Sequence, residues 1–207
     1  SVDGDNISGT GELANPFASI QAGINFASSS DSVLVGPGTY YDNLDFRGRA
    51  ITVRGSEGSQ NTIVDGNGLA SVVQFENSEI NTSKLIGFTI TNGNAHTGGG
   101  IYIRFASPIL EDLRVTNNVA GYQGGGIYAE YSNPIIYNCI VSNNQCPNLG
   151  GGVMLFGSRA EVGNTEISQN FAGSGGGGVS IGNSPSPILT NVLITNNSAT
   201  YHGAGVF

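Results

Sequence analysis

Residues 98–126 read GGGIYIRFASPILEDLRVTNNVAGYQGGG and contain one unit of a repeat followed by the glycine triplet of the next unit. The Gly-Gly-Gly triplet that begins at Gly98 returns at Gly124, Gly150 and Gly176, each time after 26 residues. An altered copy, Gly-Ala-Gly, begins at Gly203. A fixed period of this length indicates a solenoid, in which each repeat is one coil that stacks on its neighbours.

Each repeat contains three short segments in which buried-type and other residues alternate. Such alternation predicts strands with one inward side. No helical segment separates them, so equivalent strands of successive coils must pair in parallel. The sequence therefore predicts an all-β parallel β-helix, with about 26 residues and three short strands per coil. The predicted inward columns are Ile101, Ile127, Val153 and Val179; Leu110, Ile136, Val162 and Leu189; and Val115, Val141, Ile167 and Ile194.

Two polar positions in the repeat predict bends. The first, between the second and third strands, suits a left-handed turn residue, because Asn and Asp tolerate positive φ. Its members are Asp112, Asn138, Asn164 and Asn191. The second follows the third strand and is predicted to form a hydrogen-bonded ladder inside a bend. Its members are Asn117, Asn143, Gln169 and Asn196.

The chain divides into three regions. Residues 1–31 are predicted to form an N-terminal cap with an amphipathic helix over 16–28, because Phe17, Ile20 and Ile24 follow helical spacing after Asn15-Pro16. These apolar residues would plug the open end of the first coil. Residues 32–97 form irregular first coils, and residues 98–207 form regular coils that end in an incomplete one. We interpret the start at Ser1 and this unfinished repeat as signs of a processed or excised piece.

The composition restricts the function. The net charge is −8, which argues against nucleic acid as a partner, because phosphates require a basic surface. No run of about 18 apolar residues is present to span a membrane. The two cysteines, Cys139 and Cys146, occupy positions where other repeats have Leu113 and Ala120, which predicts small buried fillers.

The N-terminal part resembles the cap and first coil of pectate-lyase-like proteins, which are right-handed parallel β-helices. The matching segments are Asn15–Gln21 and Asp31–Tyr40, followed by Ile51–Gly55 and Gly87–Gly93. The later Gly-Gly-Gly-Ile and Thr-Asn-Asn repeats are similar to those of polymorphic outer-membrane proteins. The resemblance implies a right-handed helix and an extracellular or cell-surface protein of bacterial type. It does not imply one activity, because this fold hosts lyases, hydrolases, adhesins and phage spikes.

An outward ladder of side chains on the first strand of each repeat is the best candidate for a ligand-binding surface. Aromatic faces one coil apart can stack on sugar rings or pack against a surface protein. The alternative is that the stacked tyrosines only support one another, as cross-strand pairs do. The ladder consists of Tyr102, Tyr128 and Met154, with Arg104, Glu130 and Phe156 beside them.

A polysaccharide lyase would need a basic residue to remove a proton beside a carboxylate, often with Ca²⁺. Arg104 and Lys84, the single lysine, are the candidate catalytic residues. The alternative for Arg104 is a solvated cross-strand pair with Glu130. Asp3, Asp5 and Glu12 form a possible Ca²⁺ loop, and otherwise no cofactor is expected.

Three functions remain open from the sequence. The first is a non-catalytic extracellular module for glycan binding, adhesion or surface structure, which the regular repeat and the aromatic ladder favour. The second is a lyase that cleaves uronate-containing polymers by β-elimination. The third is end-to-end self-association through the open last coil, Gly203–Phe207.

Overall fold

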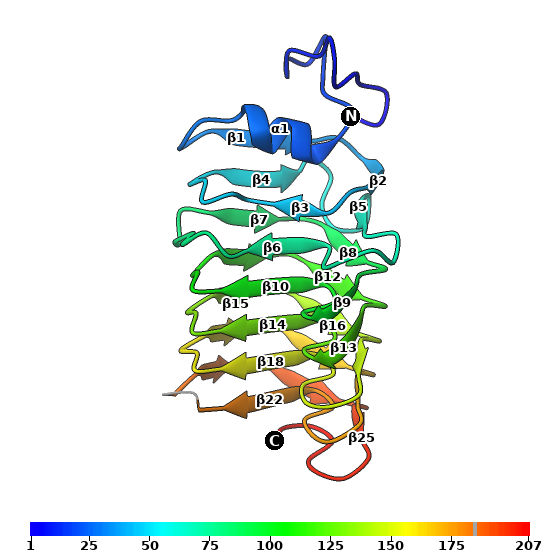
Figure 1. Ribbon diagram of the computed structural model, residues 1–207, viewed down its shortest axis with the longest axis vertical. Helices are drawn as coiled ribbons and strands as arrows, with labels where there is room; N and C mark the ends of the chain where they lie inside the picture. Colours follow the sequence, from blue (N-terminus) through cyan, green and yellow to red (C-terminus); the bar gives the residue numbers. More distant parts are fainter. Residues whose placement is uncertain (184–185) are drawn as a thin grey trace.

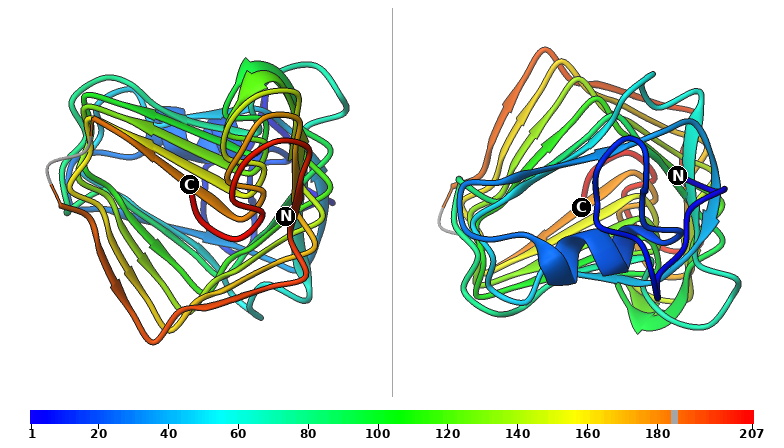
Figure 2. Two further views of the ribbon diagram at one scale, coloured as in Figure 1. Left: turned by 90° about the horizontal axis from the view of Figure 1, so that it is seen from below. Right: turned by 90° about the horizontal axis from the view of Figure 1, so that it is seen from above.

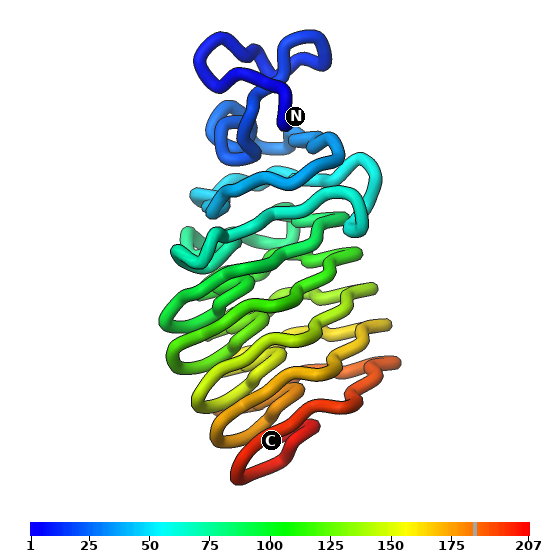
Figure 3. The backbone as a smooth tube through the Cα atoms, turned by 90° about the vertical axis from the view of Figure 1, so that its right-hand side faces the viewer, coloured from blue at the N-terminus to red at the C-terminus, as the bar shows by residue number. Residues whose placement is uncertain are grey.

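A computed structural model describes residues 1–183 and 186–207 and shows coils stacked along one axis (Figure 1). Strands of successive coils pair in parallel, and most pairs keep a constant register, as Ile101 with Ile127 and Leu110 with Ile136 illustrate. The predicted parallel β-helix is therefore confirmed. The backbone tube shows the same path repeated from coil to coil (Figure 3).

Equivalent strands form four parallel sheets, each named here by its member in the coil that begins at Gly98. The β10 sheet contains β3 (Leu44–Asp45), β6 (Val73–Phe75), β10 (Ile101–Arg104), β14 (Ile127–Glu130), β18 (Val153–Phe156) and β22 (Val179–Gly182). The β11 sheet contains β1 (Ser32–Val35), β4 (Thr52–Gly55), β7 (Lys84–Ile86), β11 (Ile109–Glu111), β15 (Ile135–Tyr137), β19 (Glu161–Gly163) and β23 (Ile188–Thr190).

The other two sheets follow in chain order. The β12 sheet contains β2 (Gly38–Tyr41), β5 (Thr62–Asp65), β8 (Thr89–Thr91), β12 (Arg114–Thr116), β16 (Ile140–Ser142), β20 (Glu166–Ser168) and β24 (Leu193–Thr195). The β13 sheet contains β9 (Asn94–Thr97), β13 (Val119–Gln123), β17 (Gln145–Cys146), β21 (Phe171–Ala172) and β25 (Ser198–Ala199).

The β13 sheet is a fourth column of strands that the sequence did not predict. It belongs to a loop that folds out at one corner of the coils (Figure 2). The ends of this corner loop touch, since a Cβ added to Gly93 would lie 1.8 Å from the carbonyl oxygen of Gly99. Its strands are as short as two residues, so they show no alternation for a sequence pattern to detect. A small apolar cluster of its own fills it: Ala120, Cys146 and Ala172.

The main core runs through the stack as columns of similar side chains. Ile101, Ile127, Val153 and Val179 are all buried, as predicted. Each fully buried aliphatic side chain contributes about 1.5–3 kcal/mol relative to exposure. In the last coil the columns are only partly buried, at Leu189 and Ile194.

One of the two predicted bends is confirmed, and the prediction for the other is corrected. Asp112, Asn138, Asn164 and Asn191 have φ between 47° and 54°, which confirms the left-handed turn. The predicted ladder of Asn117, Asn143, Gln169 and Asn196 is wrong by one residue. These four also have positive φ, at 53–57°, and this turn brings the following side chain inward. The buried ladder is Asn118, Asn144, Asn170 and Asn197, linked by amide hydrogen bonds of 2.9–3.0 Å.

The cap helix α1 (Ile20–Phe26) lies across the first coil (Figure 1). It is shorter than the predicted helix over 16–28, because Ser19, not Asn15, caps it by accepting a hydrogen bond from the N–H of Ala22. Ile20 and Ile24 are buried, as expected for a plug. Phe17 precedes the helix and its ring lies 5.4 Å from that of Phe26.

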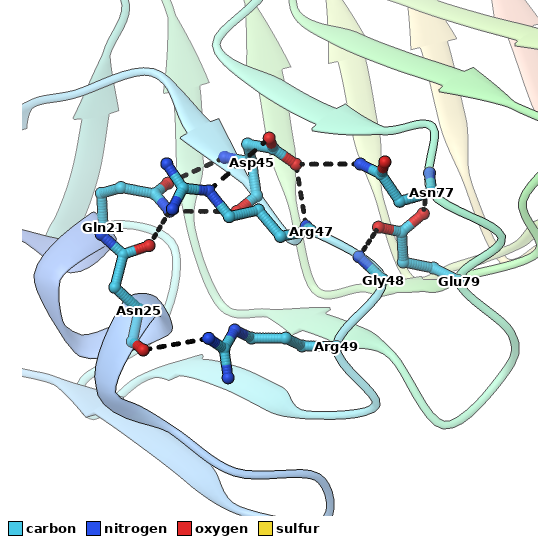
Figure 4. Close-up of polar contacts among 8 residues, drawn as sticks. All are labelled: Gln21, Asn25, Asp45, Arg47, Gly48, Arg49, Asn77 and Glu79. Carbon is cyan, nitrogen blue, oxygen red and sulfur yellow. Dashed lines mark hydrogen bonds and ion pairs between the residues drawn. The ribbon is translucent and has the colours of Figure 1, made fainter.

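Polar contacts fasten the cap to the first coils (Figure 4). Arg49 donates hydrogen bonds to the carbonyl oxygens of Asn25 and Ala27 at the end of α1. Gln21 exchanges two hydrogen bonds with the backbone of Asp45. The carboxylate of Glu79, a residue only 2% exposed, accepts hydrogen bonds from the N–H groups of Gly48 and Asn77.

Candidate functional site

Two neighbouring coils place three pairs of parallel aromatic rings on one side of the molecule. The ring centroids within each pair lie 5.6–5.8 Å apart, and the ring planes differ by 3–9°. Two of these pairs are Tyr102 with Tyr128 and Phe105 with Tyr131, and the third is at the corner loop. We call this surface the aromatic patch: His96, Tyr122, Tyr102, Tyr128, Phe105 and Tyr131.

The central pair comes directly from strand register. Tyr102 on β10 pairs with Tyr128 on β14, so their outward side chains stack. The corner-loop pair depends on an irregularity, because the pairing of β9 with β13 shifts between Ala120 and Gln123. This bulge inserts an additional residue into β13 and brings Tyr122 over His96.

The third pair stands in strained backbone. Phe105 and Tyr131 follow β10 and β14 with φ of 50° and 47°, in the left-handed region. The same turn holds Gly157 and Asn183 in the next coils, residues that tolerate this conformation. An aromatic residue there costs roughly 1–2 kcal/mol, and backbone strain of this kind gathers at functional sites. Both rings are about half exposed, at 55% and 51%.

An ion pair lies between the central and third ring pairs. Nε of Arg104 is 3.1 Å from Oε2 of Glu130 in the next coil, and the Arg104 side chain is about half exposed. The guanidinium also lies 5.0 Å from the ring centroid of Phe105. The cross-strand pair considered from the sequence is therefore present, and it adds polar donors and acceptors to the aromatic patch.

Burial changes the acidity of the central tyrosines. Tyr128 was predicted to face a ligand, but it is buried at only 7% exposed, so its ring can mainly support that of Tyr102 from below. Burial is the main reason that the pKa of Tyr128 rises to about 12, and the Glu130 charge adds to the effect. The pKa of Tyr102 is also raised, again mainly by burial.

The outward ladder of side chains predicted on the first strands is shorter in the structure than expected. Met154 was predicted to face a ligand, but its side chain is 1% exposed, so that expectation is wrong. The preceding glycine lies against this position in each coil, since an added Cβ would be 2.8 Å from the Met154 Cβ at Gly150 and 3.0 Å from the Tyr102 Cβ at Gly98. Phe156 remains at the edge, where its ring meets that of Tyr131 edge-on at 5.6 Å.

The two basic residues considered for a lyase lie on different sheets. Arg104 ends β10, whereas Lys84 begins β7 in the β11 sheet and pairs with Thr52 and Ile109. Lys84 is thus not part of the aromatic patch.

The acidic residues of the N-terminal segment do not converge. Asp5 accepts hydrogen bonds from the N–H of Ile7 and the hydroxyl of Ser8, while Glu12 pairs through its backbone with Asn15. In the described part of the chain, no three His, Cys, Asp or Glu residues gather in a way that could hold a metal ion. Asp3 therefore does not form such a group with Asp5 and Glu12.

Comparison with known proteins agrees with the architecture. The family model of the right-handed β-helix region matches residues 15–198. The chain belongs to the right-handed β-helix family. Comparisons with curated proteins and with solved structures give no match. Within the described residues, this β-helix has no helix long and apolar enough to cross a membrane.

Sequence reasoning found only part of the patch of this β-helix. It placed Tyr102, Arg104, Tyr128 and Glu130 on one face, and register puts them there. It missed Phe105. The sequence contains a signal for this residue, because an aromatic side chain stands where later repeats have Gly157 and Asn183. The pairing of His96 with Tyr122 depends on the bulge. The spacing reveals the additional residue, since Asn92 to Gly98 is six residues and Asn117 to Gly124 is seven, but not the stacking that it produces.

Proposed function

We propose that this β-helix is a non-catalytic, extracellular carbohydrate-binding module and that the aromatic patch holds the glycan. The observation that carries the proposal is the restriction of the patch to two coils. At the positions of Tyr122, Tyr128 and Tyr131, the following coil has Asn148, Met154 and Gly157. A purely structural stack would be expected to continue through the regular repeat.

The chemistry of the patch suits a sugar. Aromatic rings offer apolar surface to the C–H groups of pyranose rings, while their hydroxyl-bearing ends remain polar. Arg104 and Glu130 supply donors and acceptors for sugar hydroxyls. Because these two charges compensate each other, the patch favours a neutral glycan over a polyanion. A location outside the cell is part of the proposal and is supported by the resemblance to exported β-helix proteins.

The test is a glycan array followed by isothermal titration of the best ligand. Tyr131→Ala should weaken binding by about tenfold or more, as expected when an aromatic anchor is removed. Phe171→Ala is the matched control, because Phe171 is an exposed aromatic residue of the corner-loop column outside the patch. Equal affinity of the wild type and Tyr131→Ala would refute the assignment.

A lyase is the second candidate, and Arg104 is the observation that favours it. Its guanidinium is half exposed within the patch, but it is paired with the Glu130 carboxylate, which would have to yield its place to an anionic uronate. Ultraviolet absorbance of unsaturated products from uronate polymers, with and without Ca²⁺, tests this candidate. Product formation that disappears in Arg104→Ala would replace the binding proposal.

A further inference from the structure

A second concave site lies on the other side of the corner loop. It has a volume of about 420 Å³ and is formed mostly by polar residues of three successive coils. Its lining contains one carboxylate, several amides and one aliphatic side chain, but no Lys, Arg or His. We call it the asparagine pocket: Asp65, Asn67, Gly68, Asn92, Gly93, Asn94, Asn117 and Val119.

The pocket lies where the backbone paths of successive coils differ. After β5, residues 66–72 lead directly to β6, without a strand in the corner-loop sheet. One coil later, the chain leaves β8 through Asn92 and enters β9, the first strand of that sheet. The pocket lies at this step. Its turn residues Asn67, Asn92 and Asn117 all have positive φ, at 52–57°.

The polar groups of the pocket are partly fixed and partly free. The Asp65 carboxylate accepts hydrogen bonds from the N–H of Asn67 at 2.8 Å and from Nδ2 of Asn92 at 2.7 Å, which orient it. The side-chain amides of Asn94 and Asn117 are exposed and make no hydrogen bond to any described residue. The pocket therefore offers an oriented acceptor together with free donors and acceptors.

We propose that the asparagine pocket binds a neutral saccharide unit. Amides and a carboxylate together match neighbouring hydroxyl groups, each of which donates and accepts. The lining has no cation for an anionic ligand. Tyr41, which is 73% exposed, is the register partner of Asp65 in the adjacent strand. A single carboxylate that already accepts two hydrogen bonds is a poor Ca²⁺ ligand set.

This site goes beyond the proposed function, because none of its residues belongs to the aromatic patch. If both sites bind, one β-helix would engage a glycan surface at two points, which raises its overall avidity. The two proposals can be refuted independently, because different variants test the aromatic patch and the asparagine pocket.

The experiment is a ¹H–¹⁵N NMR titration of the Phe105→Gly/Tyr131→Gly variant, in which the patch is disabled, with maltotriose, cellotriose and mannotriose in turn. At least one probe should shift the side-chain amide signals of Asn94 and Asn117. Asp65→Ala should weaken that binding by about tenfold or more. Asn117→Gly, which keeps the backbone free to adopt φ of 57°, should also weaken it.

Asn143→Gly is the matched control, because Asn143 has the same φ of 57° at the equivalent turn but does not line the pocket. It should leave the affinity unchanged. The proposal is overturned if none of the three probes moves the Asn94 and Asn117 amide signals. It is equally overturned if only Ca²⁺ moves them, or if Asn143→Gly weakens binding as much as Asn117→Gly.

Discussion

The ring of Tyr131 occupies the space in which a side chain at position 157 would stand. A Cβ on Gly157 would lie 2.5 Å from Cδ1 of Tyr131, so the glycine of one coil allows the aromatic ring of the previous coil to lie over it. Gly182 is related to Phe156 in a similar way, with a Cβ 3.1 Å from Cδ2 of that ring. The edge of the aromatic patch therefore depends on glycines that do not themselves contact a ligand.

Gly157→Ala should displace the Tyr131 ring and weaken ligand binding without removing any aromatic residue. It should also lower the free energy of unfolding by roughly 1–3 kcal/mol, because alanine is strained at a φ of 60°. Thermal unfolding followed by circular dichroism gives the stability, and titration with the array ligand gives the affinity. Wild-type affinity in this variant would show that the position of the Tyr131 ring is unimportant.

Glu79→Ala should destabilise the first coils. The Glu79 carboxylate is buried and accepts hydrogen bonds from the N–H groups of Gly48 and Asn77, which would lose their partner. A hydrogen bond to a charged group contributes about 1.5–3 kcal/mol. Urea denaturation measures the loss, and Glu57→Ala, at an exposed position, serves as the control. Equal stability of the two variants would contradict this role.

Asn144→Leu should be among the most damaging substitutions in the regular coils. Its Nδ2 donates to Asn170 Oδ1 and to the carbonyl oxygen of Val115, and its Oδ1 accepts from the amide of Asn118. Loss of this network leaves several buried groups unpaired, which should cost about 3 kcal/mol or more. Asn143→Gly, at the adjacent exposed turn position, should cost far less. Similar denaturation midpoints for both variants would contradict the ladder.

Stability should fall at alkaline pH, in part through Tyr128. Its pKa is raised to about 12 in the folded protein, above the ordinary value of 10. The unfolded chain therefore loses this proton first, so the stabilisation is complete below pH 10 and disappears as pH rises towards 12. Unfolding free energies measured across this range should decline less steeply in Tyr128→Phe. Identical pH slopes would show that the phenol is not buried as described.

The repeat made most of the fold predictable, because the spacing of apolar residues such as Ile101, Leu110 and Val115 gives both the period and the inward columns. Local geometry was less accessible. Asn117 and Asn118 are chemically identical neighbours, and only the left-handed turn at the first decides which one is buried. The two-residue strands of the corner loop carry no periodic signal either.

The site was predictable where register alone sets it, as for Arg104 and Glu130. It was not predictable where a bulge or a change of coil path sets it. The stacking of Tyr122 on His96 needs the irregular pairing of β13. The asparagine pocket needs the segment 66–72 beside Asn92, a contact between coils of unequal length.

Binding of a neutral glycan by the aromatic patch is tested by titration of the array-selected glycan into wild type, Tyr131→Ala and Phe171→Ala. We expect Tyr131→Ala to lose about tenfold or more in affinity and Phe171→Ala to retain the wild-type value. Unchanged affinity in Tyr131→Ala, with both variants folded by circular dichroism, would contradict binding by the patch.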